Sequence, residues 1–303
     1  MTSSSVIVLG LVTAATLPSA ALQRFEAVEP HMGTLVRIQL YARDTVQADA
    51  AFRRAFARIA QLDAALSDYR DESELTRLCR ADVKRAVPIS ADLYAVLDRA
   101  LEIARETEGA FDPTLGPVTA LWGEARKERR VPDSRALREA LARTGYRHLH
   151  LDAVARTATM DIPGMRLDLG GIAKGYAAGE ALAALGIRRA LVAVSGDLAI
   201  GDAPPGARGW RIAIGATGEI RTLANCAVST SGDAEQHLDA GGVRYSHIVD
   251  ARTGMGLTRS SMVTVIAPKA MDADVWSTAL SVLGAGRARP VLARHGTFIV
   301  FFQ

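Results

Sequence analysis

The sequence Met165-Arg-Leu-Asp-Leu-Gly-Gly-Ile-Ala-Lys-Gly-Tyr-Ala177 decides how the rest of the chain is interpreted. We predict a short strand that ends at Asp168, followed by a turn at Gly170 and Gly171. A helix then begins and carries Lys174 in its first turn. The free N–H groups and the dipole of a helix N-terminus favour an anion, so this order of elements suits a phosphate group. The spacing matches neither the dinucleotide fingerprint nor the P-loop, and two glycines before a helix are also typical of a plain tight connection.

The composition is that of a soluble globular protein. The chain has 303 residues, of which 49% are hydrophobic and 23% are charged. This length fits one large domain or two closely packed ones. The net charge of +3 is small, and no aromatic residues interleave with the one basic run at residues 126–130. A nucleic-acid-binding function is therefore not expected.

The N-terminus contains an apolar segment over residues 6–17, and no charged residue precedes Arg24. The segment is too short to span a bilayer comfortably, and small residues follow it up to Ala21. We therefore predict a signal peptide over residues 1–21 and an exported protein, periplasmic or otherwise, with no stable membrane span after cleavage. No lysine or arginine precedes the apolar run, so a disordered cytosolic extension remains an alternative. Cys79 and Cys226 could pair after export or remain two buried thiols.

Hydrophobic periodicity predicts a mixture of helices and strands after residue 21. Helices are expected after Asp44 up to residue 66, from the N-cap Ser90 to Gly109, over residues 134–144, from the turn at Gly170 and Gly171 through Leu185, and over residues 271–283. Strands are expected over residues 34–41, 147–152, 157–161, 190–194, 210–214, 244–249, 261–267 and 297–302. Residues 110–117 and 124–134 are expected to form loops. This irregular order predicts one α+β domain with two lobes over residues 22–303 rather than a regular doubly wound sheet.

One pair of oxygen-bearing side chains lies on the last predicted helix. Asp274 and Thr278 are four residues apart, so a carboxylate and a hydroxyl share one face of the helix. Hard oxygen donors suit Mg²⁺, which takes few protein ligands and shares its remaining positions with phosphates and water. The alternative is a carboxylate at a helix start and a threonine that bonds to its own backbone.

A second polar pair, His247 and Asp250, lies in the segment 245–254, where a strand runs into a turn. A histidine beside a carboxylate can accept a proton near neutral pH. His247 could equally bond the turn itself. The sequence contains no nucleophile elbow with a Ser/His/Asp arrangement and no Cys/His cluster with zinc spacing.

Seven segments, in order along the chain, resemble the ApbE-like FAD:protein FMN transferases, also called flavin transferases. They are residues 32–34, 67–70, 109–114, 168–176, 229–232, 247–254 and 270–279. The resemblance extends from about Met32 to about Gly284. It implies a T-fold-related α+β domain with antiparallel sheets and flanking helices.

The resemblance also implies an activity and a site. Such an enzyme splits FAD with Mg²⁺, transfers FMN to a threonine hydroxyl of an acceptor flavoprotein, such as a subunit of a respiratory or redox membrane complex, and releases AMP. The residues expected to line the FAD site are Met32, Tyr69, Ala110, Phe111, Asp112, Asp168, Lys174 and Ile248. Asp274 and Thr278 are expected to hold the metal together with the backbone carbonyl of Gly171. His247, with Asp250, is the candidate for activating the acceptor hydroxyl.

Three positions depart from the family pattern without removing a predicted ligand. Ala251 replaces a usual proline, Ser195 replaces a usual glycine before Gly196-Asp197, and Gly179 replaces a common aspartate. Two other functions use the same residues. Water in place of threonine would give an FAD pyrophosphatase that makes FMN and AMP, and a protein without turnover would be a periplasmic FAD-binding protein.

Overall fold

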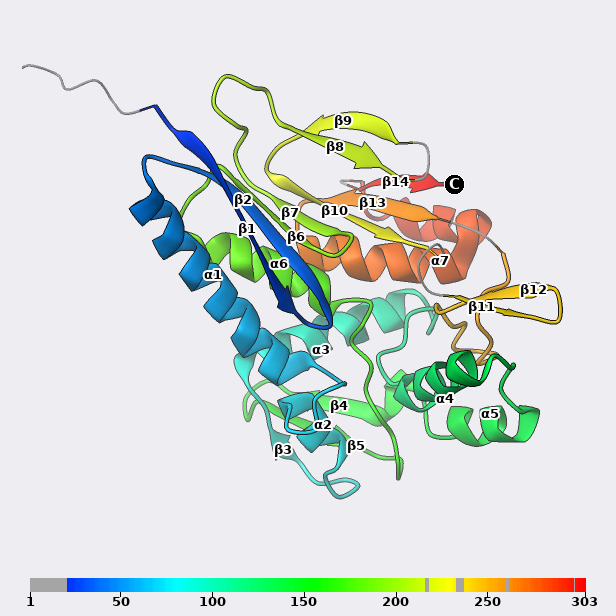
Figure 1. The fold of residues 1–303 in the computed structure, drawn as a ribbon. Coiled ribbons are helices and arrows are strands. Elements are labelled where there is room, and N and C mark those ends of the chain that lie inside the picture. The colour runs from blue at the N-terminus through cyan, green and yellow to red at the C-terminus, as the bar shows by residue number, and fades with distance from the viewer. Residues whose placement is uncertain (1–20, 216–217, 233–236, 260–261, 297) are drawn as a thin grey trace, which may run out of the picture.

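The computed structural model describes residues 21–215, 218–232, 237–259, 262–296 and 298–303. Within these ranges, a sheet of seven strands in the order β1-β2-β6-β7-β10-β13-β14 forms the centre of the fold (Figure 1). All neighbouring strands of this sheet pair antiparallel. The strands are β1 Gln23–His31, β2 Thr34–Ala42, β6 Ala190–Val194, β7 Asp197–Ile200, β10 Cys226–Ser231, β13 Val263–Ala267 and β14 Ile299–Phe302.

Three helices pack on one face of this sheet and form the main hydrophobic core with it. They are α1 Thr45–Leu66, α6 Ala173–Ala184 and α7 Ala270–Leu292. Helix α6 packs between α1 and α7 and contacts β6 and β7, whereas α7 contacts β10 and β13. Alternation explains the sheet face: Val36, Ile38 and Leu40 of β2 are fully buried, whereas the residues between them are more exposed. A smaller core on the other face lies under the hairpin of β8 Trp210–Ile214 and β9 Glu219–Leu223.

The remaining elements lie below the helical face of the sheet in Figure 1. They comprise the helices α2 Glu74–Cys79, α3 Ala91–Glu106, α4 Gly116–Glu128 and α5 Ser134–Leu141, the 3-10 turn Tyr146–His148, and the strands β3 Val87–Pro88, β4 Leu149–Asp152, β5 Thr157–Met160, β11 His237–Ala240 and β12 Val243–Ser246. Helices α4 and α5 share a separate apolar cluster with β11, centred on Trp122. Among the described residues, none of the helices has the length and apolar content that crossing a membrane requires.

Helix α7 is interrupted at Gly284, which adopts a left-handed conformation with a φ of 69°. The guanidinium of Arg259 donates hydrogen bonds to the carbonyl oxygens of Ser281 at 2.5 Å and Val282 at 2.6 Å. These carbonyls lie at the end of the first helical segment, where intrahelical donors run out. The predicted helix over residues 271–283 is therefore confirmed as the first part of α7.

The predicted α+β class with antiparallel sheets and flanking helices is confirmed, but several element predictions are wrong. Residues 165–168 form no strand; only Arg166 pairs, in an isolated bridge with Leu115. The segment 124–128 is helical rather than a loop, because Val118, Trp122 and Ala125 continue a buried helical stripe. The predicted strands over 261–267 and 297–302 begin at residues outside the described ones, and β13 and β14 form their described parts.

The strand β1 and the short elements α2, β3, β7, β9, β10 and β11 were not predicted. The edge strand β1 shows why: most of its residues are exposed, so it lacks the apolar alternation that indicates a strand. Cys79 and Cys226 are both free thiols in this structure.

Candidate active site

The loop before α6 forms the floor of the candidate site. The backbone N–H of Asp168 donates to the carbonyl of Pro113 at 2.8 Å, which fixes the loop against residues 110–117. The carboxylate of Asp168 accepts a hydrogen bond from the N–H of Gly170 at 2.8 Å. Asp168 therefore shapes the turn that leads to the N-terminus of α6.

Helices α6 and α7 meet at Gly175. A Cβ atom at this position would lie 2.3 Å from the carbonyl oxygen of Ala270 and 2.5 Å from Cβ of Asp274, so only glycine permits the contact. The close approach lets the N–H of Gly175 donate to Oδ2 of Asp274 at 2.8 Å. Asp274 is 2% exposed, and burial together with the nearby carboxylate of Asp197 raises its pKa to about 7.

Lys174 places an ammonium group between two carboxylates. Its Nζ donates to the carbonyl of Gly170 at 2.9 Å and lies 3.2 Å from Oδ2 of Asp197. Burial disfavours the charge, but the carboxylates of Asp274 and Asp197 outweigh this effect and raise the pKa of Lys174. The side chain is therefore charged at neutral pH and lies at the N-terminus of α6, where the helix itself favours an anion.

One of the predicted metal ligands, Thr278, contacts the turn at Gly171. A Cβ atom on Gly171 would lie 2.9 Å from Oγ1 of Thr278, so the turn and α7 are in direct contact. Asp274 lies one helical turn before Thr278 on the same helix. A carboxylate, a hydroxyl and a peptide carbonyl are hard oxygen donors, and this set fits Mg²⁺. The described residues contain no group of three or more His, Cys, Asp or Glu side chains that could hold a metal ion.

The loop over residues 110–114 lies against the same turn. A Cβ on Gly171 would lie 3.2 Å from Cε2 of Phe111, and both Phe111 and Ala110 are buried. The carboxylate of Asp112 accepts hydrogen bonds from the N–H and hydroxyl of Thr114, at 2.8 and 2.6 Å, and from the N–H of Tyr146 at 3.0 Å. Burial raises the pKa of Asp112. This carboxylate organises the loop, and the contact of residues 110–112 with FAD stays a prediction.

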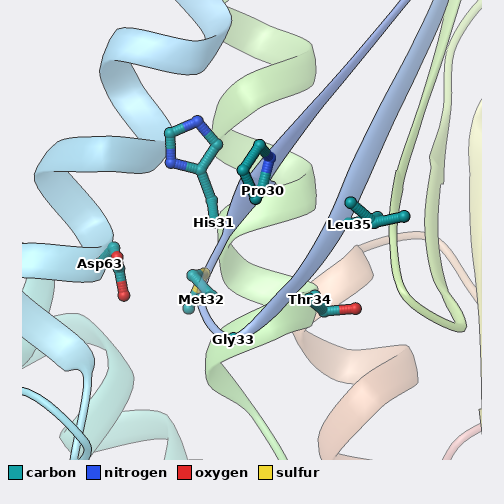
Figure 2. Close-up of a pocket in the computed structure, with 7 residues that line it drawn as sticks. All are labelled: Pro30, His31, Met32, Gly33, Thr34, Leu35 and Asp63. Atoms are coloured by element: carbon teal, nitrogen blue, oxygen red, sulfur yellow. The ribbon is translucent and has the colours of Figure 1, made fainter.

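Met32 lies at the tip of the β1–β2 hairpin, and Tyr69 lies in the loop between α1 and α2. Met32 and Gly33 form the turn between β1 and β2, both with positive φ, and line an open hollow of about 560 Å³ (Figure 2). Asp63 of α1 borders the hollow opposite the hairpin tip. Tyr69 is 85% exposed. A sulfur-bearing side chain and an exposed aromatic ring can both pack on a planar ring system.

The segment after β12 carries the predicted base. His247 is half-buried, and Ile248 is buried in the main core. The guanidinium of Arg252 donates to both carboxylate oxygens of Asp250, at 3.0 and 2.6 Å, and lowers its pKa. The carbonyl of Asp250 accepts the N–H of Gly254 at 2.8 Å. Asp250 therefore closes the turn over residues 250–254, and its predicted cooperation with His247 stays a prediction.

Sequence reasoning missed several polar residues of the site. Asp68 lies near Asp168, and burial and that second carboxylate raise the pKa of Asp68 to about 6. Asp197 is 4% exposed and accepts a hydrogen bond from Ser229 at 2.5 Å. The segments 67–70 and 229–232 both belong to the family resemblance, which was the available signal for Asp68 and Ser229.

The structure thus combines an antiparallel α+β fold with a charged lysine at a helix N-terminus, beside hard oxygen donors. The model described as "ApbE family" matches residues 32–302, and the chain belongs to this family. The family, the fold class and the enzyme class, a transferase, are thereby confirmed.

Two curated relatives and two solved structures show how far the similarity extends. An FAD:protein FMN transferase of Klebsiella pneumoniae (strain 342) is 34% identical over 281 residues, covering 88% of this chain and 80% of the relative. One of Treponema pallidum (strain Nichols) is 35% identical over 290 residues, with the same coverage of 88% and 80%. A mutant of the flavin transferase ApbE from Vibrio cholerae superposes with a TM-score of 0.84 at 30% identity, covering 92% and 93% of the chains. The apo flavinyl transferase ApbE of Pseudomonas stutzeri gives 0.82 at 31% identity, covering 93% and 91%.

Proposed function

We propose that the protein is a Mg²⁺-dependent FAD:protein FMN transferase that moves FMN from FAD to a threonine hydroxyl of an acceptor flavoprotein and releases AMP. The observation that carries this proposal is the charged Lys174, which lies at the N-terminus of α6 beside Asp274 and the Gly171–Thr278 contact. A diphosphate needs positive charge on its oxygens while its bridging bond breaks. The curated relatives carry the name of this activity.

The residues of the site have different roles in the proposed phosphoryl transfer. Lys174, at the N-terminus of α6 where the helix dipole favours an anion, binds the diphosphate of FAD and holds it in one orientation. Asp274, Thr278 and the carbonyl of Gly171 would hold Mg²⁺, which supplies further charge neutralisation to the phosphate oxygens. Met32, Tyr69 and the backbone of residues 110–112 position the ring systems.

The acceptor hydroxyl completes the reaction. Its oxygen attacks the phosphorus on the FMN side, the bond to the AMP phosphate breaks, and AMP leaves with the bridging oxygen. His247 accepts the proton of the threonine hydroxyl. A positioned base of this kind contributes a factor of about 10² to 10⁴.

We further propose that the protein acts after export, on an exported acceptor such as a subunit of a respiratory or redox membrane complex. Strand β1 begins at Gln23, so cleavage after Ala21 leaves the central sheet complete.

The direct test mixes residues 22–303 with FAD, Mg²⁺ and an acceptor domain that carries the threonine to be flavinylated. The products are then separated on a denaturing gel. A fluorescent acceptor band that disappears with EDTA supports both the transfer and its dependence on metal. Accumulation of FMN and AMP without a band would instead identify an FAD pyrophosphatase. FAD that stays bound and intact would identify an FAD-binding protein.

Substitution of His247 separates binding from transfer. We expect His247→Ala to lower the transfer rate about 10² to 10⁴-fold while the Kd for FAD, measured by flavin fluorescence, stays within a few-fold. His150→Ala is the matched control, because His150 lies on strand β4, is exposed and pairs with Asp161. Equal transfer rates in the two variants would remove His247 from the mechanism.

A further inference from the structure

A continuous chain of hydrogen-bonding groups connects Thr278 with Lys174 through the interface between β10 and α7. Oγ1 of Thr278 lies 3.2 Å from Oγ of Ser231, which lies 2.7 Å from Oγ of Ser277. Oγ of Ser277 lies 3.0 Å from Oγ of Ser229. Ser229 donates to Oδ1 of Asp197 at 2.5 Å, and the second carboxylate oxygen of Asp197 lies 3.2 Å from Nζ of Lys174.

The donors in this chain can be ordered because each hydroxyl has one hydrogen. The carboxylate of Asp197 only accepts, since Lys174 stabilises its charge, so the hydrogen of Ser229 points to Asp197. The hydrogen of Ser277 has three acceptors within reach, namely the carbonyl of Asp274 at 2.9 Å, Ser229 at 3.0 Å and Ser231 at 2.7 Å. Only donation to Ser229 keeps the chain to Asp197 continuous, and the oxygen of Ser277 is then an acceptor for Ser231.

The direction of these hydrogen bonds determines which way the hydroxyl hydrogen of Thr278 points. In this arrangement Ser231 uses its only hydrogen on Ser277, the nearer of its two partners, so in its contact with Thr278 it accepts. The hydrogen of Thr278 is thereby directed into the protein. The lone pairs of Thr278 remain for a ligand on the side of Gly171.

We propose that Ser231, with Ser277, Ser229 and Asp197 behind it, is a positioning residue that orients the hydroxyl of Thr278 as a cation ligand. Groups that hold a metal ligand in one orientation typically contribute a factor of about 10 to 100 to metal affinity. The chain also links the metal ligand to the counter-ion of Lys174, so one buried carboxylate, Asp197, orients both halves of the phosphate site. This assignment rests on the proposed Mg²⁺ site and adds residues that do not themselves contact the metal.

The strand β10 offers a matched pair of variants. Ser231→Ala removes the hydroxyl that accepts the hydrogen of Thr278 and leaves the proposed metal ligands themselves unchanged. Thr230→Ala removes the neighbouring hydroxyl, which pairs with Oγ1 of Thr264 at 2.9 Å and lies outside the chain. Ser231→Thr keeps the hydroxyl and serves as the rescue variant.

The experiment is titration calorimetry of the protein with Mg²⁺ alone, without FAD or acceptor, after thermal unfolding has shown that each variant is folded. We expect Ser231→Ala to weaken Mg²⁺ binding about 10-fold or more, and Thr230→Ala and Ser231→Thr to bind as the unmodified protein does. Ser229→Ala, which cuts the chain two links further away, should weaken binding in the same direction.

Equal Mg²⁺ affinity of Ser231→Ala and the unmodified protein would overturn the assignment and leave the proposed transferase intact. An unmodified protein that binds no Mg²⁺ would overturn it as well. Flavin transfer in the presence of EDTA would then show that the metal requirement, not the positioning chain alone, was wrong.

Discussion

Among the described residues around Lys174, the buried carboxylates outnumber the buried cations. Lys174 lies near two buried carboxylates, Asp197 and Asp274, so one positive charge serves two negative groups. Burial of an unbalanced carboxylate costs free energy unless another cation or a proton compensates it. The proposed divalent cation at Asp274 would supply that compensation and prepare the site for the negative diphosphate.

A prediction at this scale concerns Asp68, whose pKa is raised to about 6 by burial and by Asp168. A raised native-state pKa means that the folded protein binds the proton more tightly than the unfolded chain, so the contribution of Asp68 to stability falls as the pH rises from about 4 to about 6. We expect Asp68→Asn, which resembles the protonated acid, to exceed the unmodified protein in free energy of unfolding by on the order of 1 kcal/mol at pH 7.5. Near pH 4 the two should be equal.

Urea unfolding at both pH values measures this difference. Asp71→Asn is the control, because Asp71 lies in the same loop but its side chain is 85% exposed in an ion pair with Arg80. If Asp68→Asn changed the stability equally at both pH values, the carboxylate would titrate normally in the folded protein.

At the scale of elements, the contact between α6 and α7 places the anion site beside the oxygen donors. We expect Gly175→Ala to lower the free energy of unfolding by about 2 kcal/mol or more, because its methyl group would overlap the backbone of Ala270. The same change should weaken Mg²⁺ binding, since the N–H of Gly175 would no longer reach Asp274. Chemical denaturation and calorimetry measure the two effects.

Gly179→Ala, one turn further along α6, is the matched control. A Cβ there would lie 3.8 Å from Cβ of Ala270, an ordinary contact, so the substitution should be neutral or raise stability by up to about 1 kcal/mol through helix propensity. A Gly175→Ala variant as stable as Gly179→Ala would show that the helices separate at little cost.

Helical periodicity in the sequence was enough to predict part of the candidate site. Asp274 and Thr278 were placed on one helix face because their spacing matches the helical period, and the structure places Thr278 against Gly171 and Asp274 against Gly175. The strand at 165–168 was wrong for a physical reason: Met165, Leu167 and Leu169 are buried around the exposed Arg166, so the segment is extended and alternates but lacks a ladder partner.

Residues such as Asp197, Ser231 and Ser277 could not be predicted as neighbours. They lie on β7, β10 and α7, and their contacts depend on the order of strands in the sheet rather than on local spacing. Periodicity shows which face of an element is buried, but it does not show which polar group on that face meets which partner.

At the scale of the whole molecule, the described domain begins with the edge strand β1, immediately after the predicted cleavage point. We expect the protein recovered from the periplasm of a bacterial host to begin at Leu22, as measured by intact mass spectrometry. Ala21→Arg should leave the longer precursor, because a large charged residue at the cleavage position is not accepted. Recovery of the uncleaved protein in the cytosol would instead support the cytosolic alternative for residues 1–21.

The active site draws on segments that are far apart in the order of synthesis. Asp168, Asp197, Ser229 and Thr278 come from four different parts of the chain, and the first three have no complete site until α7 has packed on the sheet. The chain is synthesised from the N-terminus onward, so the proposed FAD and cation sites could not form in native geometry before Thr278 has been added. An exported chain that crosses the membrane unfolded would therefore meet both ligands for the first time in the compartment where it folds.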